Sequence, residues 1–144
     1  MNTGKIVFLK LRFVMAIIFL WAFIDKLFGL GFATAPEKAW LNGGSPTSGY
    51  LANATYGPLA PFFKSLAGVA VVDWLFMFGL LFVGLTLLFN RFVVLGAIAG
   101  AAMMLLMWLA ALPPKNNPII DEHIVYILIF WLLALYSKKK ISAA

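Results

Sequence analysis

The sequence predicts an all-α integral membrane protein, a four-helix transmembrane bundle that forms a single membrane domain over residues 1–144. Of the 144 residues, 64% are hydrophobic and only 11% are charged, and the mean hydropathy is +1.00. A soluble domain of this size needs a more polar surface, so lipid must form part of the solvent. In addition, the apolar residues fall into four segments, each close to the length that a ~30 Å hydrocarbon layer requires.

The first predicted span, residues 13–33, contains two adjacent charges. Asp25 and Lys26 follow twelve uncharged residues, and Lys26 lies about 21 Å beyond Arg12 along a helix, in the outer half of the membrane. An ionisable group at this depth costs about 3 kcal/mol or more unless it is paired or hydrated. The pair is therefore a candidate functional site.

Residues 34–68 form a long extracytoplasmic loop that is rich in Gly, Pro, Ser and Asn but also in aromatic residues. The aromatic residues predict short structured pieces over the mouth of the bundle, with Ser45 capping a turn that begins at Pro46 and a helix that begins near Pro61. The two glycines of the string WLNGGSPT allow the backbone to aim amide groups at an anion or a carbonyl ligand, although a plain turn explains them equally well. The candidate ligand-binding residues of this loop are Trp40, Asn42, Gly43, Gly44, Ser45 and Lys64.

The second predicted span, residues 69–89, carries Asp73 near its start, and the third, residues 92–112, is uncharged. Between them, Asn90–Arg91 predicts a tight turn. Asp73 is a further candidate ligand-binding residue because it enters the span from the side of the long loop.

The third span also contains Gly96 and Gly100 in a GxxxG arrangement. Small residues at this spacing let a neighbouring helix approach closely, either within the chain or in a second copy. We expect the neighbour to lie inside the chain, because a small bundle must first pack against itself.

The fourth span, residues 118–136, opens with a cluster of polar residues. Asn117 is expected to cap the helix, with a proline in the first helical position and the acidic residues near the positive end of the helix dipole. This account does not require His123, the single histidine of the chain. His123 is either a hydrogen-bonded packing residue or a proton carrier that Asp121 or Asp25 orients.

Lysine and arginine residues predict the orientation. Positive residues favour the cytoplasmic side, and only Lys38, Lys64 and Lys115 fall in the predicted outer loops, so both termini are expected in the cytoplasm. The inner side then holds seven basic residues: Lys5, Lys10, Arg12, Arg91, Lys138, Lys139 and Lys140. The net charge of +6 forms no stripe interleaved with aromatic residues, so membrane lipids are the expected partners and nucleic acid is not.

The absence of cysteine excludes several chemistries. The chain has no thiol for a disulfide relay, for ligation of an iron–sulfur cluster or for nucleophilic attack. A single histidine also excludes bis-histidine haem and a His-rich zinc site within one chain. No metal or haem is expected from this chain.

Four strings together resemble the DoxX/DoxD-type membrane proteins: FIDKLFG at 23–29, WLNGGSPT at 40–47, DWLF at 73–76 and NPIIDEH at 117–123. The resemblance implies a four-helix bundle in a prokaryotic cytoplasmic (inner) membrane. It also implies a link with respiratory or sulfur redox metabolism. The DoxD branch is associated with thiosulfate:quinone oxidoreductase, together with a second subunit, and the DoxX branch with quinol-oxidising or other oxidoreductase assemblies.

Three function classes follow, and the residues leave open whether the chain is itself an enzyme. The first is a subunit of a quinone-linked oxidoreductase acting on thiosulfate or a related small anion, with a non-covalently bound quinone as cofactor and a second subunit or a second copy as partner. The second is a non-catalytic accessory or assembly subunit, and the third is a small-molecule or lipid-binding membrane protein. In the first class Lys26 and Lys64 supply positive charge, and His123 and Asp121 handle protons. The candidate catalytic residues are Asp25, Lys26, Asp121 and His123, and Asp73 and Asn117 join the loop residues as candidate ligand-binding residues.

Overall fold

The computed structural model describes residues 3–141, and within that range the chain is all-helical, with no strand. The elements in order are α1 (Thr3–Phe28), η1 (Pro36–Lys38), η2 (Trp40–Asn42), α2 (Ser48–Asn53), α3 (Ala60–Ser65), α4 (Ala70–Leu88), α5 (Val93–Ala110) and α6 (Glu122–Ile141). The predicted helical class is confirmed. The second and third spans agree with α4 and α5 to within two residues at each end.

Helices α1, α4 and α5 are each long and apolar enough to cross a membrane. At 1.5 Å per residue, the 19 residues of α4 and the 18 residues of α5 are about 28 and 27 Å long, close to the ~30 Å of a hydrocarbon layer. Helix α6 has 20 residues, but it begins with Glu122 and its last turns contain three lysines.

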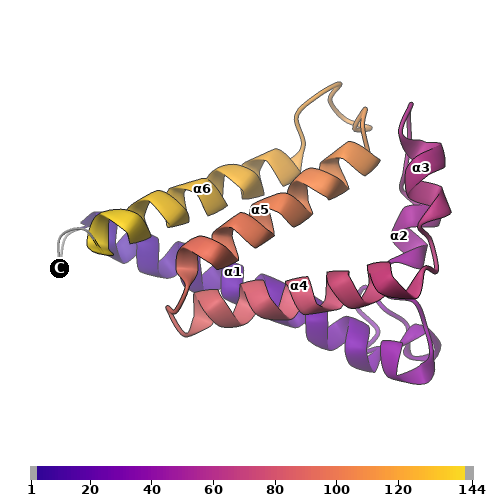
Figure 1. Cartoon of the computed structure of the whole chain (residues 1–144), viewed down its shortest axis with the longest axis horizontal. Coiled ribbons are helices and arrows are strands. Elements are labelled where there is room, and N and C mark those ends of the chain that lie inside the picture. The colour runs from indigo at the N-terminus through magenta and orange to yellow at the C-terminus, as the bar shows by residue number, and fades with distance from the viewer. Residues whose placement is uncertain (1–2, 142–144) are drawn as a thin grey trace.

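The long helices pack in pairs, α1 along α4 and α5 along α6, and α4 against α5 joins the two pairs. The pairs lie close together near the turn between α4 and α5 and separate toward the end where α2 and α3 lie (Figure 1). We call that end, with the loops over residues 29–69 and 111–121, the loop end. The opposite end, where α1 begins, α4 turns into α5 and α6 finishes, is called the basic end.

The core runs through the middle of the four long helices. Its largest fully buried apolar side chains come from α1, α4 and α6: Met15, Met77, Val83, Leu87, Phe130 and Leu133. Helix α5 adds Val93 and Met104 to the core, and between them it packs through small residues. A Cβ atom added at Gly96 would overlap the Thr86 hydroxyl of α4, and one at Gly100 would overlap the Phe130 ring of α6. The GxxxG residues therefore pack inside the chain, as predicted.

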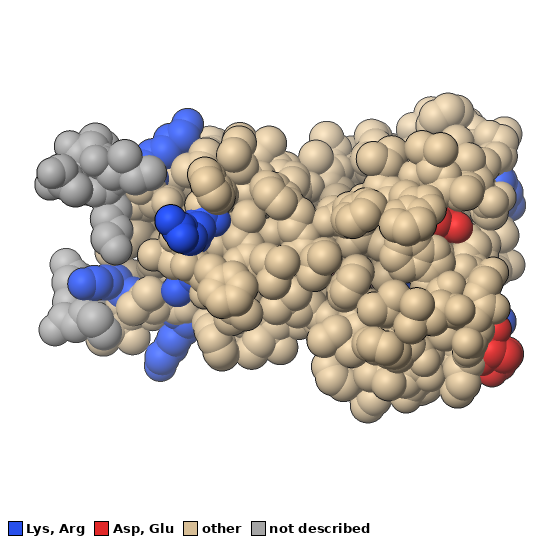
Figure 2. All heavy atoms as spheres, turned by 60° about the horizontal axis from the view of Figure 1, so that its bottom comes forward, with Lys and Arg blue, Asp and Glu red and all other residues tan. Residues whose placement is uncertain are grey.

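The outward faces of the helices are apolar. On α4 alone, Val71, Trp74, Leu75 and Phe78 are each more than half exposed. On the face shown in Figure 2, Lys, Arg, Asp and Glu gather at the two ends, and the broad band between them is almost free of charged side chains. Such a belt is suited to contact with lipid.

The predicted end of the first span at residue 33 is wrong, because α1 ends at Phe28. Gly29 has a φ of +65° and its N–H donates to the Asp25 carbonyl at 2.8 Å, which closes the helix. The chain then folds back so closely that a Cβ at Gly29 would lie 2.7 Å from Pro36 Cα. Helix α1 also includes the charged residues before the predicted span, so it begins at Thr3 and not at residue 13.

The predicted start of the fourth helix at residue 118 is also wrong, because α6 begins at Glu122. The Asn117 side-chain oxygen accepts hydrogen bonds from the Ile119 and Ile120 amides, both at 2.9 Å, and so forms a separate turn. Asp121 takes the capping role expected of Asn117, since its Oδ1 accepts from the His123 amide at 3.0 Å.

Three local predictions are confirmed. Ser45 Oγ accepts from the Ser48 amide at 3.2 Å and so caps the turn that leads into α2. Pro61 lies in the first turn of α3. Asn90 adopts a φ of +55° and the Arg91 amide donates to the Thr86 carbonyl at 3.1 Å, which makes the turn between α4 and α5 tight.

Candidate functional site

Asp25 closes the loop that follows α1. Its side chain is only 1% exposed, and its two oxygens accept hydrogen bonds from the Phe32 amide at 3.3 Å and the Ala33 amide at 2.9 Å. Within the described chain it makes no ion pair with the neighbouring Lys26. The buried charge is thus satisfied by backbone donors, as a carboxylate that orders a loop requires.

Lys26 lies on a different side of α1 from Asp25 and is half-buried. Its ammonium is 5.9 Å from the centroid of the Phe76 ring on α4, and no carboxylate within the described chain lies at ion-pairing distance. The last turn of a helix favours a cation, and the aromatic face adds to this. Lys26 is therefore a half-buried positive charge at the loop end that contacts an aromatic ring, with the Asp25 carboxylate nearby but not in direct contact.

Asp73 ties the long loop to the first turn of α4. It is 5% exposed, and its Oδ1 accepts from Ser45 Oγ at 2.8 Å, from Thr47 Oγ1 at 2.6 Å and from the Thr47 amide at 3.2 Å. Beside it, Trp40 meets Trp74 edge to face, with ring centroids 4.6 Å apart. Thr47 makes two of these three hydrogen bonds, and the sequence predicted neither the contact of Ser45 nor that of Thr47 with Asp73.

The glycines of the loop form a turn rather than an amide cradle. The Gly43 amide donates to the Trp40 carbonyl and the Gly44 amide to the Ala39 carbonyl, both at 3.0 Å, so neither amide is aimed at a ligand. Gly43 has a φ of +85°, which glycine adopts without strain, and a Cβ at Gly44 would overlap the carbonyl of Lys38. Of the two interpretations of these glycines, the structure supports the plain turn.

The other predicted ligand-binding residues of the loop end are solvent-facing. Asn42 is exposed, and its side-chain amide donates to the Pro36 carbonyl at 2.9 Å. Lys64 on α3 is exposed. Asn117 is exposed and engaged in its own turn. None of these three contacts Asp25, Asp73 or His123 through a hydrogen bond within the described residues.

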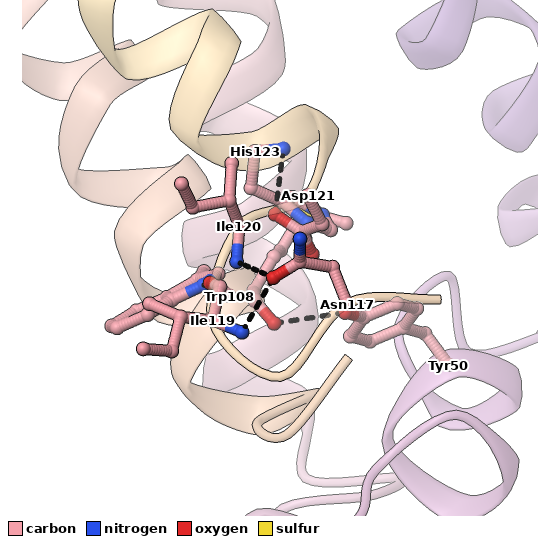
Figure 3. A network of polar contacts seen from close by, with 8 residues as sticks. Tyr50, Trp108, Asn117, Ile119, Ile120, Asp121 and His123 are labelled. Carbon is pink, nitrogen blue, oxygen red and sulfur yellow. Dashed lines mark hydrogen bonds and ion pairs between the residues drawn. The ribbon is translucent and has the colours of Figure 1, made fainter. Parts of the chain in front are cut away.

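Asp121 and His123 form a direct pair at the start of α6 (Figure 3). His123 Nδ1 lies 2.8 Å from Asp121 Oδ2, and His123 is 9% exposed. An ionised Asp121 makes Nδ1 the protonated nitrogen of a neutral ring, which leaves Nε2 to accept a proton. Of the two predicted orienting residues, Asp121 and Asp25, the structure assigns this contact to Asp121.

Tyr50 on α2 joins the same region, and sequence reasoning missed it. Its hydroxyl donates to the Met107 carbonyl of α5 at 2.9 Å (Figure 3). Burial, followed by the nearby charges of Asp121 and Glu122, raises the pKa of Tyr50 to about 12. No spacing motif connects Tyr50 with the start of α6, because the contact depends on how α2 folds over the bundle.

With the long loop on one side of the membrane, the predicted spans bring the ionisable groups of the first, second and fourth spans to one end, where the sequence predicts a shared pocket. The structure places these groups at one end. The end of α1 and the starts of α4 and α6 all lie at the loop end (Figure 1). However, the carboxylates of Asp25, Asp73 and Asp121 each bind a different segment, so they do not form one shared cluster. The pair that combines burial, direct contact and a titratable nitrogen is Asp121–His123.

The chain matches no protein-family model, no curated protein and no solved structure. The resemblance to the DoxX/DoxD proteins thus remains a prediction based on the four quoted strings.

Proposed function

We propose that this chain is the membrane subunit of a quinone-linked oxidoreductase and that His123, oriented by Asp121, is its proton-transferring residue. The observation that carries the proposal is the 2.8 Å contact between His123 Nδ1 and Asp121 Oδ2 at the loop end. A carboxylate in this position holds the ring in one orientation and stabilises the imidazolium when Nε2 takes a proton. The resemblance to DoxX/DoxD proteins supplies the reaction class.

A bound quinone would accept two electrons and two protons, and the chain would pass both protons from water to the quinone in turn through His123 and supply a positive charge. His123 Nε2 is the ring nitrogen that Asp121 leaves free, so it is the atom that would pass a proton to the bound quinone. The chain has no cysteine, so the electrons must come directly from a small anion such as thiosulfate or through a cofactor of a partner subunit.

Lys26 is the second residue of the proposed site. Lys26 is half-buried, its ammonium has the Phe76 ring as a neighbour, and among the described residues no carboxylate lies at ion-pairing distance, an arrangement that fits a small anion or the polar edge of a quinoid ring. Asp25 and Asp73 hold loops instead. Of the four catalytic residues expected from the sequence, Asp25 is therefore left out of the proposal, and Lys26, Asp121 and His123 are kept. Lys64 remains a surface charge that would attract an anionic substrate.

In this proposal α6 is the fourth transmembrane helix, and both termini face the cytoplasm of a prokaryotic cell. Seven of the eleven Lys and Arg residues and none of the five Asp and Glu residues belong to the basic end, as the positive-inside rule favours. The chain has no thiol, so Lys38→Cys and Lys138→Cys variants can be labelled separately from outside whole cells. Labelling of only the Lys38→Cys variant is expected, and the reverse pattern would overturn the orientation.

The activity test uses the full chain in lipid vesicles with a soluble quinone and thiosulfate, alone and with any subunit that co-purifies. Because a general acid contributes on the order of a hundredfold, His123→Gln should lower quinone reduction by about that factor, and Asp121→Asn by about tenfold. Lys26→Met should also lower the rate, whereas its matched control Lys38→Met should not. Wild-type rates in both His123→Gln and Lys26→Met would remove the site assignment.

A non-catalytic accessory subunit is the second candidate, and one observation favours it. The most buried carboxylates, Asp25 and Asp73, are both satisfied by donors of the loops beside them, as a purely structural polar layer requires. In that case His123→Gln should lower the amount of a co-purifying complex while the turnover of each remaining complex stays unchanged. Measuring complex abundance and turnover on the same preparations separates the two functions.

A further inference from the structure

The basic end is rich in lysine and arginine. The five acidic residues of the sequence all belong to the loop end, whereas Lys5, Lys10, Arg12, Arg91 and the lysines at 138–140 belong to the basic end. Figure 2 shows this separation on one face of the molecule. Of these residues, Lys5, Lys10, Arg91 and Lys138 are exposed and Arg12 is half-buried.

Arg12 is held at the end of α4. Its guanidinium donates through Nη1 to the Leu87 carbonyl and, at 3.2 Å, to the Leu88 carbonyl, which are among the last carbonyls of that helix. Arg91 follows Leu88 by three residues and is exposed in the tight turn to α5. The two arginines therefore lie at the same level of the molecule, one on α1 and one on the turn.

The turn between α4 and α5 stops short of the ends of α1 and α6 (Figure 1). From Thr3 to Arg12, α1 extends about 14 Å beyond the level at which Arg12 contacts α4. Phe8 stacks on Tyr136 with ring centroids 4.4 Å apart, which holds the extended parts of α1 and α6 together. The result is a step, with the α4–α5 turn as its floor and the extended part of α1 as its wall.

The step carries positive charge on both surfaces. Lys5 and Arg12 are seven residues apart and so lie on the same face of α1, two turns from each other. At Arg12 this face of α1 contacts the end of α4. Nearer the start of α1, the same face has no α4 beside it and faces the α4–α5 turn, which carries Arg91. Three basic side chains thus surround the step, and no acidic residue of the sequence lies at this end.

We propose that this step binds the headgroups of anionic phospholipids. Helix α4 is about as long as the hydrocarbon layer is thick, so the floor of the step lies where the phosphates begin. Arg91 is exposed, so its guanidinium is the one that can form paired hydrogen bonds with a phosphate, while Arg12, held by the carbonyls of α4, adds positive charge. Basic residues at a membrane surface attract anionic lipids. This inference rests on the apolar belt and on the charges of the basic end, and it is independent of the proposed redox function.

The test compares two double variants that remove equal charge from opposite ends. Purified protein is incubated with equal amounts of phosphatidylglycerol and phosphatidylcholine of the same chain length, and the bound lipids are counted by native mass spectrometry. The wild type should retain phosphatidylglycerol preferentially. Lys5→Gln/Arg91→Gln should lower the ratio by about fivefold for each charge removed, whereas Lys38→Gln/Lys115→Gln, which removes two exposed charges of the loop end, should leave it unchanged.

Two further measurements make each outcome decisive. Lys5→Arg/Arg91→Lys, which keeps both charges, should retain the wild-type ratio of bound lipids. In the wild type, salt at about 0.5 M should lower that ratio, and this measurement does not depend on whether any variant folds. A wild-type preference for neither lipid, an equal loss in both glutamine variants, or displacement of the lipid by inorganic phosphate would each overturn the proposal.

Discussion

Removing the Asp73 carboxylate should release the long loop from the start of α4. Asp73 Oδ1 accepts hydrogen bonds from Ser45 Oγ, Thr47 Oγ1 and the Thr47 amide, and both Asp73 and Thr47 are buried. In Asp73→Ala the two Thr47 donors lose their acceptor without gaining water. Ser45 is only half-buried and can turn its hydroxyl to solvent.

The magnitude follows from the donors left unpaired. Each buried donor without a partner costs about 1–3 kcal/mol, so the two donors of Thr47 together cost roughly 4 kcal/mol. Asp73→Asn keeps an acceptor oxygen and loses only the charge. Since hydrogen bonds to a neutral acceptor are about half as strong as those to a charged one, it should cost about 1–2 kcal/mol.

Hydrogen exchange at the Thr47 amide measures this directly, because exchange requires the loop to open. Asp73→Ala should speed exchange at Thr47 by on the order of a thousandfold, and Asp73→Asn by about tenfold. Glu37→Gln, which neutralises an exposed acid on η1, is the control and should have no effect. Unchanged exchange in Asp73→Ala would refute the view that this carboxylate holds the loop.

Two other substitutions test packing and titration. Gly100→Ala places a methyl group against the fully buried Phe130 ring and should destabilise the chain by about 1–3 kcal/mol in thermal unfolding. Gly49→Ala, with open space around its Cβ, should instead stabilise by less than about 1 kcal/mol, and equal effects would contradict the packing described for α5. For Tyr50, the folded-state pKa of about 12 lies above its ordinary value of 10.0, so its contribution to stability is complete below pH 10 and falls as the pH rises toward 12. Between pH 10 and 12, the apparent melting temperature should fall less steeply with pH in Tyr50→Phe than in the wild type. Equal slopes in the two proteins would show that Tyr50 does not titrate as described.

The sequence alone determined the features that depend on local residues. Long apolar runs predicted the membrane class and the bounds of α4 and α5, because hydrophobicity summed over some 20 residues outweighs any single contact. Capping residues and prolines predicted the turn at Ser45 and the start of α3, since such bonds join residues only three or four positions apart. Among the predicted polar residues, the contact between Asp121 and His123 is of the same local kind.

Tertiary structure decided what each polar side chain binds. Asp73 reaches Thr47 across 26 residues, Tyr50 reaches Met107 across 57, and Arg12 reaches Leu87 across 75, so none of these contacts follows from spacing along the chain. The sequence therefore placed Asp25, Asp73 and His123 at one end of the molecule correctly, but it could not separate loop-holding carboxylates from a titratable pair. A buried carboxylate binds whichever donors the folded loops bring within about 3 Å, and the packing of distant segments sets that position.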